Sequence, residues 1–265
     1  MGFLTDFVAE TRRELAAHPL QRDVLAEAAT EAPEARNLAW TLREYAADDG
    51  VAVIAEVKRA SPSAGAIAAE VDPVLQATAY DVAGAAVISV LTEPRYFGGS
   101  MDDLRAVRAA VEHPVLRKDF LVHPDQVLEA RAAGADTVLL ISACLTDGEL
   151  TQLLATAREL GMEPLVETHT DADLDRVLAT DAAVVGVNAR DLETLEVDVP
   201  QALARLARIE AGRVAVLESG IRTRSDVVAA VDAGASAILV GETLMRAHDP
   251  GATLHELIHG KEIPI

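Results

Sequence analysis

Aromatic residues and cysteines are scarce in this sequence, and both shortages limit what the chain can form. Half of the 265 residues are hydrophobic but only 3% are aromatic. The core must therefore consist of Ala, Val, Leu and Ile, which suits a parallel sheet covered by helices. The single cysteine, Cys144, excludes an intramolecular disulfide. Because it lies in the apolar run TVLLISACL, we expect a small buried hydrophobic residue rather than a catalytic thiol.

Positive charge is also scarce, and no long apolar run is present. The formal net charge of -20 argues against nucleic acid and against an anionic membrane surface as partners. No run approaches the ~18 apolar residues that a membrane helix needs, and the charged stretch MGFLTDFVAETRREL lacks the core of a signal peptide. We therefore expect a cytoplasmic protein without membrane or nucleic-acid partners, as a monomer or weak homo-oligomer.

The chain changes character near residue 49. Residues 1–48 show helical spacing without a strand-like run, whereas short Val/Ile/Leu runs alternate with Ala-rich amphipathic segments beyond them. These eight runs are VAVIAEV (51–57), AAVISVL (85–91), PVLRKDF (114–120), DTVLLIS (136–142), EPLVET (163–168), AVVGVN (183–188), RVAVLES (213–219) and SAILVGE (236–242). Eight strands close a TIM barrel. We therefore predict a single α/β domain over 1–265, with a helical extension over 1–48 and a (β/α)8 barrel over 49–265.

The tripeptide Ala-Gly-Ala recurs at 83–85, 133–135 and 233–235, each time just before a predicted strand. A glycine there would end a helix in the left-handed conformation and let the chain turn into the strand. In an alanine-rich chain the tripeptide also arises by chance, but its constant position favours a structural role. An open doubly wound sheet is the alternative fold. It would usually carry a Gly-rich phosphate loop after its first strand, where this chain has EVKRASPSAG.

Polar residues stand at the ends of the predicted strands, where TIM barrels gather their chemistry. They are Glu56, Lys58, Ser89, Lys118, Ser142, Glu167, Asn188, Arg190, Glu218, Ser219 and Gly241. Opposite charges packed at one site keep each other ionised, and burial pushes their pKa values toward neutrality. We expect a setting for proton transfer. Structural ion pairs are the alternative interpretation.

Lysine usage favours the proton-transfer interpretation. Among 23 basic residues only Lys58, Lys118 and Lys261 are lysines. Two of them end strands, where an ammonium can donate a proton and a guanidinium effectively cannot. Glu56 and Lys58 lie two residues apart, so both should point to the same side of their strand.

Two glycine-containing strand ends, ESG (218–220) and VGE (240–242), precede predicted helices. Backbone amides of such paired loops bind phosphate in many TIM barrels, although a tight turn alone explains a single glycine equally well. The stretch HELIH (255–259) matches a zinc-protease pattern. It lacks the context of a site, so we expect no metal there and instead expect Leu257 and Ile258 to pack inward. His123 and His169 follow strand ends and are interpreted as loop residues, with a supporting role left open.

Several longer motifs occur in one order along the chain. They are IAEVKRASPSAG (54–65), LTEPRYFGGSMDDL (91–104), PVLRKDFLV (114–122), GADTVLLI (134–141), LVETHT (165–170), VGVNARDLETLEVD (185–198), ESGIRTRSDV (218–227) and ASAILVGETLM (235–245). From about residue 50 onward the chain closely resembles the indole-3-glycerol phosphate synthase family of tryptophan biosynthesis. The resemblance implies closure of 1-(2-carboxyphenylamino)-1-deoxyribulose 5-phosphate to indole-3-glycerol phosphate, with loss of carbon dioxide and water and without metal or organic cofactor.

The resemblance also implies roles for the charged strand ends. Lys118 corresponds to the general acid that protonates the ribulose carbonyl as the ring carbon attacks it. Glu167 corresponds to the base of the later dehydration, and Lys58 to a second lysine that balances substrate charge and can protonate the departing hydroxyl. Glu56 and Glu218 would hold these ammoniums and orient substrate hydroxyls.

Substrate-binding positions follow from the same resemblance. Asn188 and Arg190 would bind near the anthranilate carboxylate and the ribulose oxygens, where the planar fork of arginine suits a carboxylate. Ser61 belongs to a first loop that folds over the ligand in the family, and Phe120 lines an aromatic pocket. The phosphate loops correspond to Ser219, Gly220, Gly241 and Glu242.

Small departures and two alternatives remain. Ala64 and Ala189 stand where many members of the family have lysine and asparagine. A phosphoribosylanthranilate-type isomerase would share the phosphate loops but would not need two strand-end lysines and an aromatic pocket. A barrel that only binds a phosphorylated ligand could dispense with Lys118 and Glu167. Since the predicted substrate is anionic and so is the protein, Lys58, Arg59, Lys118 and Arg190 would have to reverse the field locally.

Overall fold

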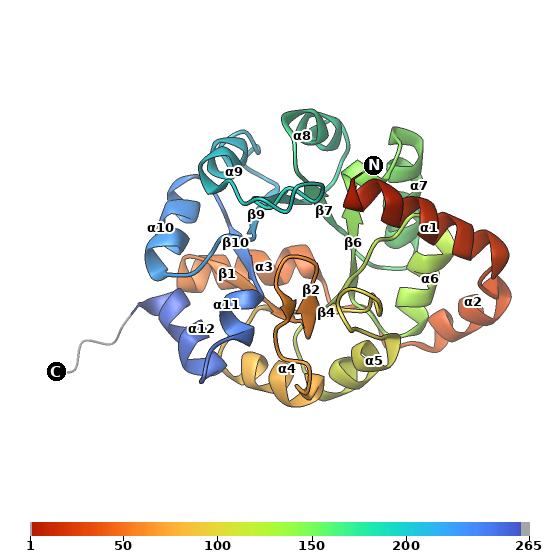
Figure 1. Cartoon of the computed structure of the whole chain (residues 1–265), viewed down its shortest axis with the longest axis horizontal. Helices are drawn as coiled ribbons and strands as arrows, with labels where there is room; N and C mark the ends of the chain where they lie inside the picture. Colours follow the sequence, from red (N-terminus) through yellow and green to blue (C-terminus); the bar gives the residue numbers. More distant parts are fainter. Residues whose placement is uncertain (1, 261–265) are drawn as a thin grey trace.

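Figure 1 shows a closed ring of parallel strands surrounded by helices in the computed structural model, which describes residues 2–260. The strand order is β1-β10-β9-β8-β7-β6-β5-β4, and β4 pairs with β1 to close the ring. The barrel strands are β1 (Ala52–Val57), β4 (Val87–Leu91), β5 (Val115–Lys118), β6 (Thr137–Ile141), β7 (Leu165–Thr168), β8 (Val184–Asn188), β9 (Val214–Glu218) and β10 (Ala237–Val240). This architecture confirms the predicted (β/α)8 barrel.

Each barrel strand lies inside one of the eight predicted runs and is shorter than the run. The remaining residues of the runs lie mainly in bends and loops beside the strands, while Ser142 and Glu242 already begin helical segments. One small element lies outside the prediction. It is a hairpin of β2 (Ala60–Ser61) and β3 (Gly65–Ala66) in the loop after β1, where the polar, Gly-containing sequence carries no strand pattern.

Helices α1 (Phe3–Ala17), α2 (Arg22–Glu31) and α3 (Leu38–Asp49) precede the barrel. The helices after the strands are α4 (Pro73–Val82), α5 (Met101–Ala110), α6 (Pro124–Ala132), α7 (Asp147–Glu159), α8 (Asp171–Leu178), α9 (Val199–Leu206), α10 (Arg224–Asp232), α11 (Glu242–Met245) and α12 (Pro250–His259), with a 3-10 turn η1 (Ser142–Cys144). Local sequence sets several starts. At α7, α8 and α10 a threonine N-cap and an acid three residues later satisfy each other's backbone N–H groups.

The glycines of the Ala-Gly-Ala repeat end helices as predicted. Gly84, Gly134 and Gly234 have φ values of +95°, +89° and +101°, each just after the last turn of α4, α6 or α10. Glycine adopts this left-handed backbone without the steric cost that a Cβ atom imposes. The repeat therefore marks three equivalent helix-to-strand turns.

The core consists of aliphatic side chains from the strands and the inner faces of the helices. Every residue of β1, β4, β6, β8 and β9 is buried, as expected for a parallel sheet covered on both faces. Cys144 is also buried, and burial raises the pKa of its thiol. Both observations agree with the expected role as a small hydrophobic residue.

The N-terminal end of the barrel is held by a buried aspartate. Asp136 stands just before β6 and is fully buried. Its carboxylate accepts hydrogen bonds from the backbone N–H of Val115 at 2.8 Å, from that of Arg36 at 2.9 Å and from the Arg108 guanidinium at 3.0 Å. Because Arg36 lies between α2 and α3, this carboxylate ties the N-terminal segment to the strands. Charged hydrogen bonds of this kind compensate the burial of the acid.

Helix α1 packs on the opposite end, against the loops that follow several strands (Figure 1). Its contacts join Thr5 to Glu193, Phe7 to Phe120, Glu10 to Arg95 and Arg12 to Glu149. None of the helices within residues 2–260 combines the length and apolar character of a membrane span. Lys261, the third lysine, lies outside the described residues.

Candidate active site

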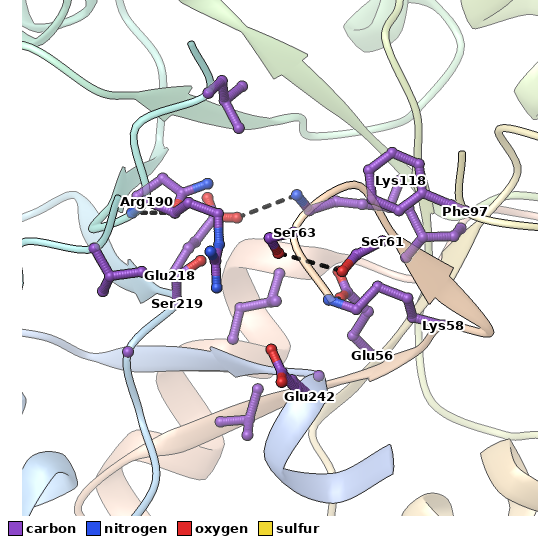
Figure 2. Close-up of a pocket in the computed structure, with 18 of the residues that line it drawn as sticks. Glu56, Lys58, Ser61, Ser63, Phe97, Lys118, Arg190, Glu218, Ser219 and Glu242 are labelled. Carbon is purple, nitrogen blue, oxygen red and sulfur yellow. Dashed lines mark hydrogen bonds and ion pairs between the residues drawn. The ribbon is translucent and has the colours of Figure 1, made fainter. Parts of the chain in front are cut away.

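A cavity of about 380 Å³ opens at the end of the barrel where the strands finish. Every site residue predicted from the sequence lines it, and Figure 2 shows ten of the lining residues labelled around one space. The predicted residues are Glu56, Lys58, Ser61, Lys118, Phe120, Glu167, Asn188, Arg190, Glu218, Ser219, Gly220, Gly241 and Glu242. Two other strand ends do not line the cavity. Ser89 is buried, and Ser142 Oγ donates a hydrogen bond to the backbone carbonyl of Glu167 at 2.8 Å.

Lys118, at the end of β5, carries the ammonium at the centre of a buried charge cluster. Its Nζ lies 3.1 Å from Oε2 of Glu167 and 3.4 Å from Oε2 of Glu218. The side chain of Lys118 is 14% exposed, whereas each glutamate side chain is 1% exposed. The buried ammonium is tolerated because acids from two other strands compensate its charge.

Two of the three charged groups do not shift toward neutrality as expected. Burial would lower the pKa of Lys118, but the charges of Glu167 and Glu218 outweigh it, and the pKa lies above its usual value. Burial would raise the pKa of Glu167, but Lys118 and then His169 hold it well below its usual value. Only Glu218 follows the expectation, because burial and then the charge of Glu167 raise its pKa well above the usual value. Charge pairing therefore prevails over desolvation at Lys118 and Glu167.

The second lysine is paired with a third acid of the cavity. Lys58 Nζ lies 2.6 Å from Oε1 of Glu56, and Figure 2 shows both side chains together. The two-residue spacing correctly predicts that they share one side of the chain. Gly241, after the neighbouring strand β10, leaves room for this pair, because a Cβ atom there would lie 2.4 Å from Glu56 Oε1.

A second glycine makes room for the other buried acid. Gly186 is in the middle of β8, and a Cβ atom on it would lie 2.2 Å from Oε1 of Glu218. Heavy atoms cannot approach that closely, so a side chain at this position would displace the carboxyl. Glycine is therefore needed here for close approach of Glu218 rather than for a turn.

We expect Gly186→Ala to destabilise the protein by about 1–3 kcal/mol, the usual cost of overpacking a core. Urea unfolding would measure the change in the free energy of unfolding. Gly148→Ala is the matched control, because a Cβ atom there meets nothing within 4 Å. Alanine in that helix should be neutral or stabilising by up to about 1 kcal/mol. Equal stability of the two variants would contradict the steric role of Gly186.

Asn188 and Arg190 are linked to the charge cluster through the end of β8. Asn188 Nδ2 donates to Oε1 of Glu167 at 3.1 Å, and Asn188 Oδ1 accepts from the backbone N–H of Arg190 at 3.0 Å. The Arg190 guanidinium donates to the carbonyl of Leu195 at 2.9 Å. The amide of Asn188 thus fixes one carboxylate oxygen, while Arg190 is held at the wall of the cavity.

The predicted phosphate end lies after β9 and β10. Ser219 and Gly220 have φ values of +66° and +81°. This backbone costs a residue with a side chain about 1–3 kcal/mol and often marks functional sites. Gly241 precedes the short helix α11, and Arg222 and Arg246 line the cavity beside these loops. Neither arginine belongs to the predicted set, although both follow a predicted phosphate loop by a few residues.

Aromatic residues gather at the cavity although they are rare in the chain. The rings of Phe97 and Phe120 have centroids 6.2 Å apart, and the ring of Phe7 in α1 packs in a tilted arrangement against Phe120 with centroids 4.3 Å apart. Phe97 and Phe120 line the cavity directly. Phe97 is absent from the predicted set. Its position beside two glycines, just after a strand, in a chain with only 4 phenylalanines, is the signal that could have found it.

Two other side chains depart from the expectations. Arg59 does not line the cavity, because its guanidinium pairs with Asp103 at 2.6 Å and donates to the carbonyl of Gly98. The cationic side chains that line the cavity are Lys58, Lys118, Arg190, Arg222 and Arg246. His169 is the other departure. Its side chain is 6% exposed, and Nε2 lies 2.9 Å from Oε1 of Glu167, so it is not an ordinary loop residue.

The HELIH segment forms the end of α12. Leu257 and Ile258 are buried as predicted, while His255 and His259 are exposed. In the part of the chain that the structure describes, His, Cys, Asp and Glu side chains form no group of three or more that could hold a metal ion.

Comparison with known proteins first identifies the fold. A 3-hexulose-6-phosphate synthase structure superimposes with a TM-score of 0.62 at 18% identity, over 78% of this chain and 98% of that one. Tryptophan synthase subunit alpha from Legionella pneumophila gives 0.59 at 16% identity, over 84% and 97%. At these identities the likeness shows the fold alone.

Sequence relatives are far more similar. Indole-3-glycerol phosphate synthase from Mycolicibacterium vanbaalenii is 48% identical over 258 residues, 96% of this chain and 93% of that protein. The enzyme of the same name from Kineococcus radiotolerans is 49% identical over 261 residues, 97% and 95% of the two chains. The model of the family Indole-3-glycerol phosphate synthase matches residues 4–257. With this match over nearly its whole length, the chain belongs to the indole-3-glycerol phosphate synthase family.

Proposed function

We propose that this chain closes 1-(2-carboxyphenylamino)-1-deoxyribulose 5-phosphate to indole-3-glycerol phosphate, releasing carbon dioxide and water. Membership of the family supports the reaction. One observation from the site carries the proposal: Lys58, Lys118 and Glu167 line a single cavity whose wall includes Phe97 and Phe120. The site thus offers acid and base groups beside an aromatic surface, which suits a substrate that carries an anthranilate ring.

Lys118 is proposed as the acid of the first step. The anthranilate ring carbon attacks the ribulose carbonyl, a carbon–carbon bond forms, and the carbonyl oxygen takes a proton. Nζ of Lys118 is the buried ammonium best supplied with compensating acids. Because its ammonium donates to Glu167 and is paired with the charge of Glu218, the substrate oxygen has to replace part of that contact before the transfer can occur.

Glu167 is proposed as the base of the last step. After ring closure, the bond to the carboxylate carbon breaks and its electron pair restores the aromatic ring. The new hydroxyl then leaves with a proton from Lys58 while a carboxylate takes a proton from the ring nitrogen. Glu167 suits this role because its pKa is held below its usual value, by Lys118 against the effect of burial, so that it is ionised.

Binding roles are proposed for the remaining residues. Arg190 and Asn188 would receive the carboxylate and ribulose oxygens, since a guanidinium and an amide donate to such groups. Backbone N–H groups after β9 and β10 would hold the phosphate. The chain as a whole has a formal charge of -20. Arg222 and Arg246 would supply positive charge locally, beside the phosphate. Ser61, whose Oγ lies 3.3 Å from Oγ of Ser63, would contact the ligand from the loop after β1.

The other candidate functions are less well supported. A phosphoribosylanthranilate-type isomerase would use the phosphate loops but would not need the Lys58–Glu56 pair for its reaction. A binding protein without activity would not need Lys118 and Glu167 in one buried cluster. The single domain over 1–265, the cytoplasmic location and the monomeric or weakly oligomeric state stay predictions.

The test is an assay of indole fluorescence with purified protein and the carboxyphenylamino substrate in excess chelator. We expect product to appear at the same rate with and without chelator, because the proposed acid and base are all side chains. A fluorescence signal that vanishes with chelator and returns with Zn²⁺ would contradict the cofactor-free proposal. Absence of product under all conditions, with tight binding of the substrate, would favour a binding protein.

A further inference from the structure

His169 stands in the wall between the candidate active site and a second cavity. It follows β7 directly and its side chain is almost completely buried. On its outer side, a cavity of about 420 Å³ is bordered by α1 and by the loops after β7 and β8. On its inner side, its ring contacts the carboxylate of Glu167. The imidazole thus lies behind Glu167 as seen from the substrate cavity.

The two oxygens of Glu167 have different surroundings. Oε1 lies 3.1 Å from the amide nitrogen of Asn188 and 2.9 Å from Nε2 of His169. Oε2 lies 3.1 Å from Nζ of Lys118. Oε1 therefore faces the neighbouring side chains of Asn188 and His169, and Oε2 faces the ammonium of Lys118. A carboxylate held at one oxygen cannot rotate about its last torsion without losing the contacts of that oxygen with Asn188 and His169.

We propose that His169 is a positioning residue for Glu167, fixing Oε1 so that Oε2 is the oxygen that accepts the proton. The proposal rests on the proposed function, in which Glu167 is the base of the dehydration. His169 itself is separated from the substrate cavity, which it does not line. The ring is not aligned for a straight hydrogen bond to Oε1, so His169 directs the carboxylate through the polarity of its N–H group.

Charged side chains surround Glu167 and His169. Glu167 faces Lys118 from β5 and Glu218 from β9. The outer cavity that His169 borders also contains the acidic side chains of Asp173, Asp191 and Glu193 together with Arg12. The pKa of Asp191 is lowered, mainly by the backbone N–H of Thr194 and to a smaller extent by His169. His169 is thus surrounded by acids, and Glu167 is the only one of them that lines the substrate cavity.

Two substitutions at His169 distinguish the effect of losing the N–H donor from the effect of losing the ring. His169→Phe keeps a ring but removes the donor, and we expect kcat to fall by about tenfold to a hundredfold with KM changed by less than about twofold. His169→Gln keeps a neutral N–H near the position of Nε2 and should retain most of the turnover. His255→Phe is the matched control, since His255 is exposed on α12. It should leave both constants unchanged.

The pH profile gives a readout that a purely structural role would not move. The acidic limb of the kcat profile should shift to higher pH in His169→Phe, because Glu167 loses a group that helps to keep its pKa low. In the Glu167→Gln background, His169→Phe should cause no further loss of rate. A full additional loss there would overturn the proposal, as would a rise in KM at unchanged kcat.

Thermal unfolding of each variant checks that the fold is kept. If His169→Phe does not fold, His169→Gln still decides, because a loss of tenfold or more with the donor retained would overturn the positioning role. A separate measurement does not depend on activity. Carboxyl ¹³C NMR, with the Glu167 signal assigned from its absence in Glu167→Gln, should show a higher pKa of Glu167 in His169→Phe. An unchanged pKa overturns the proposal, whereas a wild-type chain that forms no indole product overturns only the proposed function.

Discussion

Lys118→Ala is expected to lower turnover by at least about a hundredfold, the range of general acid catalysis. Removing the ammonium removes the proton donor for the ribulose carbonyl and leaves Glu167 and Glu218 without their buried cation. Binding of a substrate analogue with a reduced carbonyl should stay nearly unchanged, because the phosphate loops lie after β9 and β10. Steady-state fluorescence measures the turnover, and calorimetry measures the binding. Near-normal turnover would exclude Lys118 as the acid.

Lys118→Arg is the control that separates charge from proton donation. An arginine supplies a cation to Glu167 and Glu218 but does not release its proton at any pH at which the protein is folded. We therefore expect this variant to unfold at a temperature close to that of the wild type and to remain as slow as Lys118→Ala. The alanine variant should be less stable, because leaving buried acids unpaired costs about 3–5 kcal/mol. Rapid turnover by the arginine variant would show that charge alone is required.

Glu167→Gln is the second substitution with a large expected effect. It keeps the shape of the side chain and removes the base, so dehydration should slow by roughly 10² to 10⁴-fold. Ring closure and decarboxylation should continue, and the ring-closed, decarboxylated hydroxyl intermediate should accumulate. Single-turnover reactions quenched in acid and analysed by mass spectrometry would detect a species that has lost carbon dioxide but retains the water.

A matched acid on the surface controls for the loss of charge. Glu159 is exposed near the end of α7, and Glu159→Gln should react like the wild type. If Glu167→Gln instead accumulates unreacted substrate, the residue acts before ring closure and the assignment to dehydration fails. Normal release of product without any intermediate would exclude it as a base altogether.

Much of the fold can be predicted from the sequence because the barrel repeats one unit. Each strand is a short apolar run, and the turns before three of them carry a glycine that must adopt a positive φ, as Gly84 does. The β2–β3 hairpin could not be predicted in the same way. Its residues have no β propensity, and its pairing arises only because Ala60 and Ala66 meet in the folded loop.

The site was predictable where it depends on strand ends and less so where it depends on tertiary packing. Lys118 and Glu167 are found from position alone, since parallel strands bring their carboxyl ends to one face. The direction of their pKa shifts requires the distances between them, because burial and pairing act in opposite directions. The sequence marks His169 only as a residue after a strand end, two positions beyond Glu167. Its contact with Glu167 depends on the way the chain turns after β7.

The buried Asp136 stabilises the N-terminal end of the barrel, far from the reacting groups at the other end. Its hydrogen bonds with Arg36, Arg108 and Val115 connect the N-terminal extension to the N-terminal ends of the strands. Lys118 and Glu167 lie at the C-terminal ends of their strands. Since parallel strands place these two groups at opposite ends of the barrel, substitutions around Asp136 can raise the thermal stability without changing the geometry of Lys118 and Glu167. Stabilising substitutions should therefore be sought first at the N-terminal end of the barrel, where greater rigidity does not affect substrate binding.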